Sequence, residues 1–389
     1  MKKVNLFIPF LLISIMATAN DFDIVVDKIL ESNPTIQNEI AKSNAEYLSL
    51  RTENNFANPD ISFEALFGEF GENKFNVGVS QSFDWPSLYK ARSRQSESWR
   101  IASESAIAET KNQIQLEAST ILASIVTSQN KIELYQQIAD KFSDLLTTYE
   151  AEYQRGNVSI LDVNKLRVEV ADNLAALENE QLIYDELLSS LSILSGSADF
   201  ESQVSMIDII PHFELNPLET YINSALTNSP KIAAINARRD LAEREINVTS
   251  ASNLPGFSLG YRYSYEGLQN FHGFSFGMTL PTWGNQGKKI AAKAALTSVE
   301  IEQNNTIIAL KKEIERDYNK AVILKKQINR YGNALITSDN LGMLLKAYEG
   351  GQLDLTAYIQ DVSYFLNAQI QLHDLQLQLA TTIFRLNSY

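Results

Sequence analysis

Residues 257–280 read FSLGYRYSYEGLQNFHGFSFGMTL. On each side of a turn at 266–270, aromatic or aliphatic residues occupy every second position, and mostly small or polar residues lie between them. A period of two is typical of β-strands, whose successive side chains point to opposite faces. The stretch therefore predicts a hairpin with one aromatic-rich face and one small, polar face.

A second pair of alternating segments lies in the first half of the chain, at 61–67 and 75–83. Such strands suit either a soluble sheet with one face on a core or a membrane barrel with its apolar face toward lipid. Strands of about 10 residues, tilted by about 45°, span the hydrocarbon layer. The remaining sequence is helical and has its own apolar seam to fill, so the pattern favours the barrel.

One chain supplies only four such strands, which cannot close a barrel. An open sheet edge in lipid leaves backbone polar groups unsatisfied. Two chains would give eight strands with a filled interior, whereas three would give twelve strands around a lumen. The sequence thus predicts an oligomer, with three chains as the smallest open solution. In it, Phe276 and Leu259 are expected to face lipid, Ser275 and Gly260 the lumen, and the turns 69–74 and 266–271 the outside of the cell.

An internal duplication sets the rest of the architecture. Four landmarks recur at offsets of 196, 196, 198 and 195 residues: Pro34 and Pro230, Pro59 and Pro255, Trp85 and Trp283, Gly156 and Gly351. A near-constant offset indicates two copies of one unit. We therefore expect a first repeat at 20–195, a linker at 196–217 that carries Gly, Ser, Asp and Pro, and a second repeat at 218–389.

Each unit shows the same order of elements. A helix (22–54, then 218–252) precedes the hairpin, a long helix (88–153, then 286–349) follows it, and a glycine turn leads to a last helix (159–194, then 353–388). The long helices carry a heptad seam, with Asp317, Ser338 and Gly342 as lapses in the second copy. A seam this long predicts helix-on-helix supercoiling over roughly 100 Å. A rod-like coiled coil shares this pattern, so the strands decide between the two architectures.

The N-terminus has the pattern of a secretory signal. Lys2 and Lys3 precede an apolar run, and Ala17-Thr18-Ala19 supplies a cleavage site, so 1–19 is predicted to be removed. The mature net charge would then be −16, because the leader takes away 2 of the 33 basic residues and none of the 47 acidic ones. A chain this acidic repels nucleic acid.

No catalytic constellation is present in the sequence. The chain has no cysteine, and His212, His272 and His373 do not stand at metal-ligand spacing, so neither a thiolate nor a tetrahedral zinc site is indicated. Residues 284–289 are not a phosphate loop, since the glycine spacing is short and no Ser or Thr follows the lysine. We expect no enzyme activity and no cofactor.

The duplication, the two hairpins, the long helices and the two tip turns together resemble the TolC-like outer-membrane efflux proteins. The first turn, Gly156-Asn157-Val158-Ser159-Ile160-Leu161-Asp162-Val163, is similar to the family's turn signature, and the second, at 348–355, matches less closely. The resemblance implies a mainly helical homotrimer, with a twelve-stranded barrel in the outer membrane and a coiled-coil tunnel in the periplasm. It implies an exit duct for an inner-membrane pump, reached through a periplasmic adaptor, in efflux or type I secretion.

The tip turns are the candidate functional site. A glycine that reverses the chain needs a left-handed conformation, and Val158 and Leu353 just beyond offer apolar contacts. The resemblance implies an adaptor-docking tip and a gate; the alternative is a plain glycine cap with a solvated Asp162. The docking residues would be Gly156, Val158, Gly351 and Leu353, and the gating residues Asp162, Tyr348 and Asp361.

Two points qualify the resemblance. The family's aspartates after the second turn would fall near Ala357 and Gln360, where this chain has Asp361 instead. Trp283-Gly284-Asn285 and the short C-terminus are similar to the metal-efflux branch. The rival functions are a periplasmic coiled-coil adaptor, which has one hairpin rather than two, and a structural coiled-coil protein, which needs no amphipathic strands.

Overall fold

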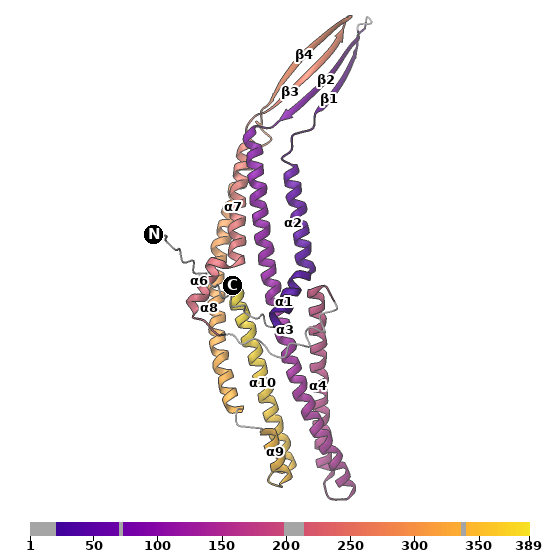
Figure 1. The fold of residues 1–389 in the computed structure, drawn as a ribbon, viewed down its shortest axis with the longest axis vertical. Helices are drawn as coiled ribbons and strands as arrows, with labels where there is room; N and C mark the ends of the chain where they lie inside the picture. Colours follow the sequence, from indigo (N-terminus) through magenta and orange to yellow (C-terminus); the bar gives the residue numbers. More distant parts are fainter. Residues whose placement is uncertain (1–20, 70–72, 198–213, 336–339) are drawn as a thin grey trace, which may run out of the picture.

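The computed structural model describes residues 21–69, 73–197, 214–335 and 340–389. They form an elongated molecule with a β-sheet at one end and bundled helices over the rest of its length (Figure 1). The predicted leader at 1–19 and most of the predicted linker lie outside the described residues.

The sheet consists of the two predicted hairpins side by side. Strands β1 (Asp60–Phe67), β2 (Asn73–Phe83), β3 (Gly256–Glu266) and β4 (Gln269–Thr279) are antiparallel in the order β1-β2-β3-β4. Glu266 pairs with Gln269, so Gly267 and Leu268 alone form the second turn, both with positive φ (55° and 69°). This is the type I′ geometry whose twist matches that of the flanking strands.

The long helices occur where the heptad pattern predicts them. Helix α3 spans Pro86–Gln154 without interruption, and α4 (Ile160–Ser195) runs back along it. In the second half, α8 (Lys288–Leu335) and α9 (Asn340–Glu349) lie within the predicted helix 286–349, and residues 336–339 between them lie outside the described residues; α10 (Leu355–Ser388) follows. Seam residues such as Ala118, Ile125 and Leu310 are fully buried.

The first helix of each half differs from the prediction. In place of one helix at 22–54 the chain forms α1 (Asp21–Ser32) and α2 (Pro34–Thr52), and in place of one at 218–252 it forms α6 (Leu218–Asn228) and α7 (Pro230–Ala251). The residue before a proline is pushed out of the helical region. Asn33 and Ser229 accordingly adopt extended ψ angles of 122° and 126°, and each proline starts the next helix.

The break at Asn33 is also a joint between helices. The buried Asn33 side chain accepts a hydrogen bond from the Ile36 backbone N–H (2.9 Å), which caps α2, and donates one to the Leu194 carbonyl oxygen (2.7 Å) in the last turn of α4. Gly196, with φ 70°, leaves no room for a Cβ against Pro34. The start of α2 therefore abuts the end of α4, so that both helices pack along α3.

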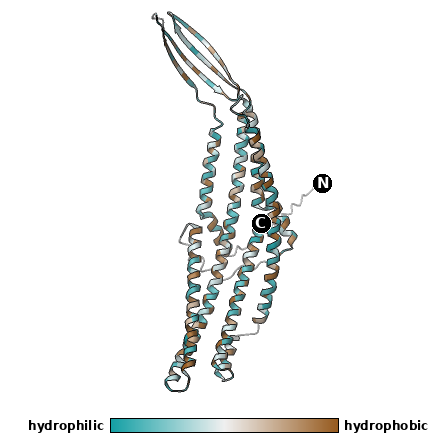
Figure 2. Cartoon of the chain, turned by 180° about the vertical axis from the view of Figure 1, so that it is seen from behind, coloured by the Kyte–Doolittle hydropathy of each residue, from teal (hydrophilic) through white to brown (hydrophobic). Residues whose placement is uncertain are grey.

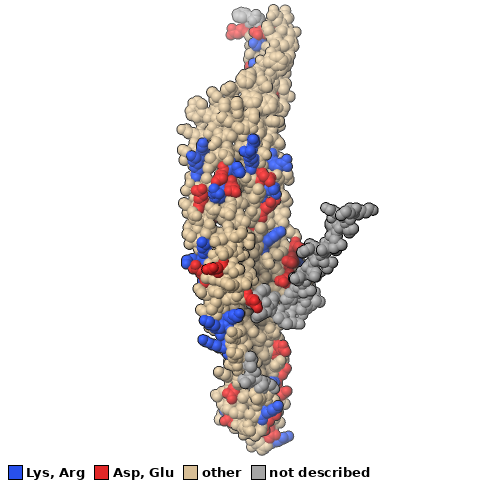
Figure 3. All heavy atoms as spheres, turned by 60° about the vertical axis from the view of Figure 1, so that its left-hand side comes forward, with Lys and Arg blue, Asp and Glu red and all other residues tan. Residues whose placement is uncertain are grey.

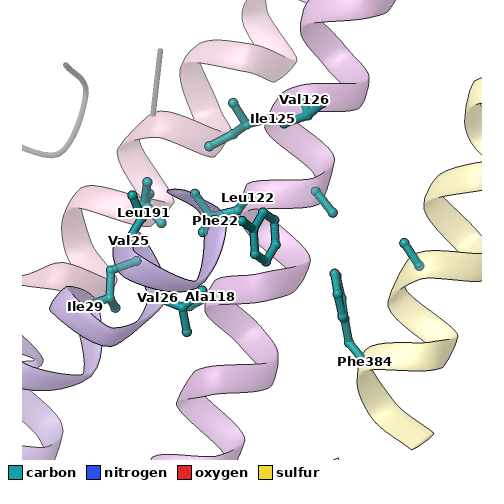
Figure 4. Close-up of a cluster of buried hydrophobic side chains, with 12 residues drawn as sticks. Phe22, Val25, Val26, Ile29, Ala118, Leu122, Ile125, Val126, Leu191 and Phe384 are labelled. Atoms are coloured by element: carbon teal, nitrogen blue, oxygen red, sulfur yellow. The ribbon is translucent and has the colours of Figure 1, made fainter. Parts of the chain in front are cut away.

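Buried apolar side chains form clusters between the helices. Figure 4 shows one cluster in which Phe22, Val25 and Ile29 of α1 meet Leu122 and Ile125 of α3, together with Leu191 of α4 and Phe384 of α10. A second cluster joins α6, α7, α8 and the end of α10. Burial of the first cluster joins α10 of the second half to the first half, whereas the second cluster packs the helices of the second half against one another.

Asp317, a lapse in the predicted seam, is buried at 1% exposure beside the second cluster. Its carboxylate accepts a hydrogen bond from the Tyr389 hydroxyl (2.7 Å) and from Arg316 Nε (3.0 Å), and Arg385 lies 3.6 Å away. Burial opposes its charge, but these hydrogen bonds and cations lower the pKa of Asp317 below its ordinary value. The carboxylate thus ties the end of α10 to α8.

The Asn33 joint makes a testable contribution to stability. Asn33→Ala removes a helix cap and leaves the Leu194 carbonyl without its partner, so we expect a loss of roughly 1–2 kcal/mol, seen as a lower melting temperature of the purified protein. Asn55→Ala is the matched control, because Asn55 is exposed near the end of α2. Equal melting temperatures for the two variants would contradict the joint.

Candidate functional site

The sheet carries its polar and apolar residues on separate faces. Direct cross-strand partners share a face, and the register places Ile61, Val79, Tyr261 and Phe274 in one row and Leu259 beside Phe276 in another. These side chains are 43–93% exposed in the single chain. Figure 2 shows the alternation along the strands.

All five charged residues of the four strands lie on the other face: Asp60, Glu64, Lys74, Arg262 and Glu266. In the face shown in Figure 3, charged side chains of the sheet gather near its outer rim, and the surface between rim and helices is uncharged. Water can solvate the charged side chains of one face, whereas the exposed aromatic face carries no charged residue. The sheet is therefore built to separate an apolar medium from an aqueous one.

Small residues allow close side-chain packing on the polar face. A Cβ at Gly78 would lie 2.8 Å from Ser62 Oγ. A Cβ at Gly260 would lie 2.6 Å from Ser275 Oγ, and one at Gly277 would lie 2.6 Å from Ser258 Oγ. Glycine in a strand marks a close approach of this kind. Such crowding is expected on the inner face of a curved sheet, where side chains converge.

The two outer strands leave an edge unpaired. β1 pairs only with β2, and β4 only with β3, within the described part of the chain. Each edge presents a row of backbone N–H and C=O groups that water or another strand must satisfy. In an apolar medium only another strand can do so.

At the opposite end of the molecule, two glycine turns reverse the chain (Figure 1). Gly156 (φ 78°) donates to the Tyr153 carbonyl at 2.9 Å, and Asn157 donates to that of Glu152 at 2.9 Å. Gly351 (φ 69°) and Gln352 repeat the same pair of bonds after α9. This is the Schellman motif, in which a left-handed glycine closes a helix, as predicted for both positions.

The residues after the turns are placed less simply than the sequence indicates. Val158 and Leu353, expected to be exposed, are half-buried, whereas Leu161 is 67% exposed and Ile160 40%. The Ser159 hydroxyl accepts a hydrogen bond from the Leu161 N–H and caps α4. Ile160 and Leu161 therefore lie in the first turn of that helix. A serine at position 159 is a sequence signal for the start of this helix, but packing determines which of its side chains remain exposed to solvent.

The two hairpins of one chain meet near the tip through tyrosines. The Tyr348 hydroxyl of α9 lies 2.6 Å from the Tyr149 hydroxyl of α3, and the Tyr348 ring stacks on that of Tyr358 at 4.8 Å. Burial, and then the bond to Tyr149, raise the pKa of Tyr348, so it stays neutral. Tyr348 thus has its partner within the chain, and the sequence could not indicate a contact 199 residues away.

A groove of about 660 Å³ lies between the first turns of α4 and α10. Leu161, Val168 and Ile359 line it together with Asp162, Lys165, Glu169 and Gln360. Lys165 Nζ lies 3.7 Å from Asp162 and donates to Thr356 at 2.9 Å, and Ser363 donates to Glu169 at 2.9 Å. Asp162 therefore faces this groove, whereas Asp361 lies beyond the first turn of α10 and outside the groove lining.

The described residues offer neither a metal cluster nor a membrane-spanning helix. They contain no group of three His, Asp or Glu side chains that could hold a metal ion. Among their helices, none combines the length and the apolar character needed to cross a membrane.

The comparisons with known proteins identify the fold. No family model and no curated protein matches the sequence. The Campylobacter jejuni CmeC outer membrane channel matches with a TM-score of 0.78 at 16% identity, over 95% of this chain and 85% of that chain. A membrane protein from Pseudomonas aeruginosa matches with a TM-score of 0.74 at 17% sequence identity, over 94% of this chain and 92% of that chain. The open state of the Neisseria gonorrhoeae MtrE outer membrane channel matches with a TM-score of 0.67 at 14% sequence identity, over 95% of this chain and 88% of that chain. The fold predicted from the sequence, that of the TolC-like channels, is confirmed.

The tyrosine contact predicts coupling between the two hairpins. Tyr149→Phe and Tyr348→Phe each remove one hydroxyl but keep the ring, so their effects on stability should be non-additive by about 0.5–1.5 kcal/mol. A double-mutant cycle from urea unfolding measures this, with the more exposed Tyr153→Phe in place of Tyr149→Phe as the control pair. Additive effects of the two substitutions would mean that the hydroxyl contact carries no energy.

Proposed function

We propose that this chain is the outer-membrane exit duct of a tripartite efflux or type I secretion system. Three copies would conduct substrates passively from an inner-membrane pump to the outside, with the sheet in the outer membrane and the helices in the periplasm. The observation that carries the proposal is the sheet of the described chain: all its charges lie on one face, its exposed aromatics other than Phe271 lie on the opposite face, and both edges are unpaired.

The sheet supports three copies rather than one. Lipid on the aromatic face requires every edge group to be paired, so β4 of one copy would join β1 of the next. Four strands from each of three copies make a twelve-stranded barrel, wide enough for a lumen. The polar face, with its small Ser and Gly residues, would line that lumen.

The glycine turns would form the periplasmic tip where an adaptor docks. Gly156 and Gly351 carry no side chain that would block a partner, and nothing lies within 4 Å of either Cβ position. Val158 and Leu353 would flank the docking surface. Asp162, Tyr348 and Asp361 would gate the tip, with Tyr348 acting through Tyr149 in this chain.

The organisation of the chain follows from the same proposal. A leader at 1–19 would direct secretion, and the repeats at 20–195 and 218–389 would each supply one strand hairpin and one helical hairpin, joined by 196–217. Matching element orders in the two halves support this division. No step of conduction requires catalysis, a cofactor or nucleic acid.

A narrower proposal concerns the cargo. Trp283-Gly284-Asn285, similar to the metal-efflux branch, lies between β4 and α8, with Trp283 85% exposed and Asn285 Nδ2 donating to the Ser252 carbonyl. Metal ions as cargo would make a strain that lacks this chain sensitive to copper or silver salts. Unchanged metal tolerance, with sensitivity to organic compounds, would exclude that branch.

The rival functions differ in where the protein resides. An adaptor or a structural coiled-coil protein would not fractionate with the outer membrane as an SDS-resistant, heat-modifiable oligomer, whereas an exit duct would. Recovery of the chain only in the soluble periplasmic fraction would contradict the proposed duct.

The lipid-facing register can be tested with a pair of neighbouring residues. Phe276→Arg places a charge on the lipid face at a cost of roughly 2–4 kcal/mol if the position is near mid-bilayer, whereas Ser275→Arg places it in the lumen. We expect SDS-resistant oligomer in the outer membrane to fall strongly for the first and little for the second. Equal assembly of the two variants would show that the faces are assigned wrongly.

The docking role of the tip can be separated from simple helix capping. Gly156→Ala and Gly156→Trp share the strain of a positive φ, about 1 kcal/mol, and differ only in bulk. We expect the alanine variant to export and the tryptophan variant to lose efflux while its oligomer stays abundant, measured as dye accumulation in cells with the cognate pump. Asp162→Ala with Tyr348→Phe should raise single-channel conductance. Normal efflux by Gly156→Trp, with unchanged conductance in the double variant, would show that Gly156 only caps a helix and that the tip has no docking or gating role.

A further inference from the structure

One basic side chain on the polar face of the sheet has no partner among the described residues. Arg262 of β3 is exposed and makes no ion pair or hydrogen bond with the described residues. Its direct neighbours across the sheet are Gly78 of β2 and Gly273 of β4, which have no side chains. The space over β4 is open, since nothing lies within 4 Å of a Cβ at Gly273. The guanidinium is therefore free to bind a solute.

Within the described part of the chain, the other charged residues of this face form no ion pair with Arg262. Lys74 and Glu266 form an ion pair with each other at 2.8 Å near the outer rim. Glu64 accepts a hydrogen bond from Asn76 at 2.7 Å. Glu64 and Asp60 both lie on β1, two strands and about 10 Å from β3 at the usual strand spacing. If β1 of another copy paired with β4, its carboxylates would again lie two strands away from Arg262, because β4 would lie between them. β4 itself has no charged residue.

Phe271 is the one aromatic residue on the polar face of the described strands. It pairs with Ser264 and is half exposed, in the row next to that of Arg262. Diagonal neighbours of this kind lie about 7–8 Å apart, within reach of long and aromatic side chains. A guanidinium and an aromatic ring thus face the same aqueous space at a distance that one small molecule can span.

We propose that Arg262 and Phe271 form a lumenal binding site for aromatic anions, such as aryl carboxylates and sulfonates. The proposal rests on the proposed function, in which the polar face lines the lumen. A guanidinium binds an oxyanion through two parallel N–H donors, and an arene packs against the phenylalanine ring. Three copies would supply three such sites at one level of the barrel, and rings of basic side chains select anions in pores.

The test uses the full-length oligomer in planar lipid bilayers. In a KCl gradient at about 10 mM, where charges act over roughly 30 Å, Arg262→Gln should lower the chloride-to-potassium permeability ratio. We expect a change of about two- to fivefold, from one charge per copy acting through water. 2-Naphthalenesulfonate should block the wild-type current more strongly than that of Arg262→Gln.

Three further variants separate the parts of the site. Arg262→Lys should keep the permeability ratio but weaken the block, because a lysine lacks the paired donors. Phe271→Ser should keep the ratio and lose much of the block. The double variant Lys74→Gln/Glu266→Gln, which removes an ion pair on the same face without changing net charge, should change neither.

The outcomes distinguish this site from the function on which it rests. Channels whose permeability ratio and block are the same in wild type and Arg262→Gln would overturn the site and leave the duct in place. Block that is lost in Arg262→Gln but unaffected by Phe271→Ser would overturn the aromatic half. A wild-type protein that forms no channels would overturn the duct and the site together.

Discussion

The continuity of α3 is the constraint on which the rest of the structure depends. It runs for 69 residues, or about 100 Å, while α2 and α4 have 19 and 36 residues. Two shorter helices must therefore meet end to end beside it, and the ends of helices carry unsatisfied amides and carbonyls. Asn33 satisfies one of each where α2 meets α4, and it does so in a buried position. Without such a joint, α3 would be covered along only part of its length.

This scaffold separates two ends with different chemistry. At one end the sheet places exposed aromatics opposite five charged residues, so its faces suit different media. At the other end, glycine caps and polar side chains close the helical hairpins. The rigid helices between them fix the distance from sheet to tip, which suits a protein that bridges two compartments.

The features that the sequence predicted are those set by neighbours in the chain. Strand alternation, heptad spacing and the glycine caps at Gly156 and Gly351 are local, and the structure has all of them. The heptad lapse at Asp317 has its reason in Tyr389 and Arg385 of another helix. Pro34 was recognised as a landmark but not as a helix boundary, although a proline displaces the preceding residue from the helical region locally. Only the contact of Asn33 with Leu194 is distant in sequence.

The contacts between helices indicate where the molecule separates most easily. Near the tip, α4 meets α10 through the bonds of Lys165 to Thr356 and of Ser363 to Glu169, and each such bond contributes only about 0.5–1.5 kcal/mol net because water replaces it readily. By contrast, α10 meets α3 through buried Phe142, Tyr358 and their apolar neighbours, which water cannot replace. Separation of α10 from α4 therefore costs less than separation of α10 from α3. The groove at Asp162 lies at this weaker contact between α4 and α10.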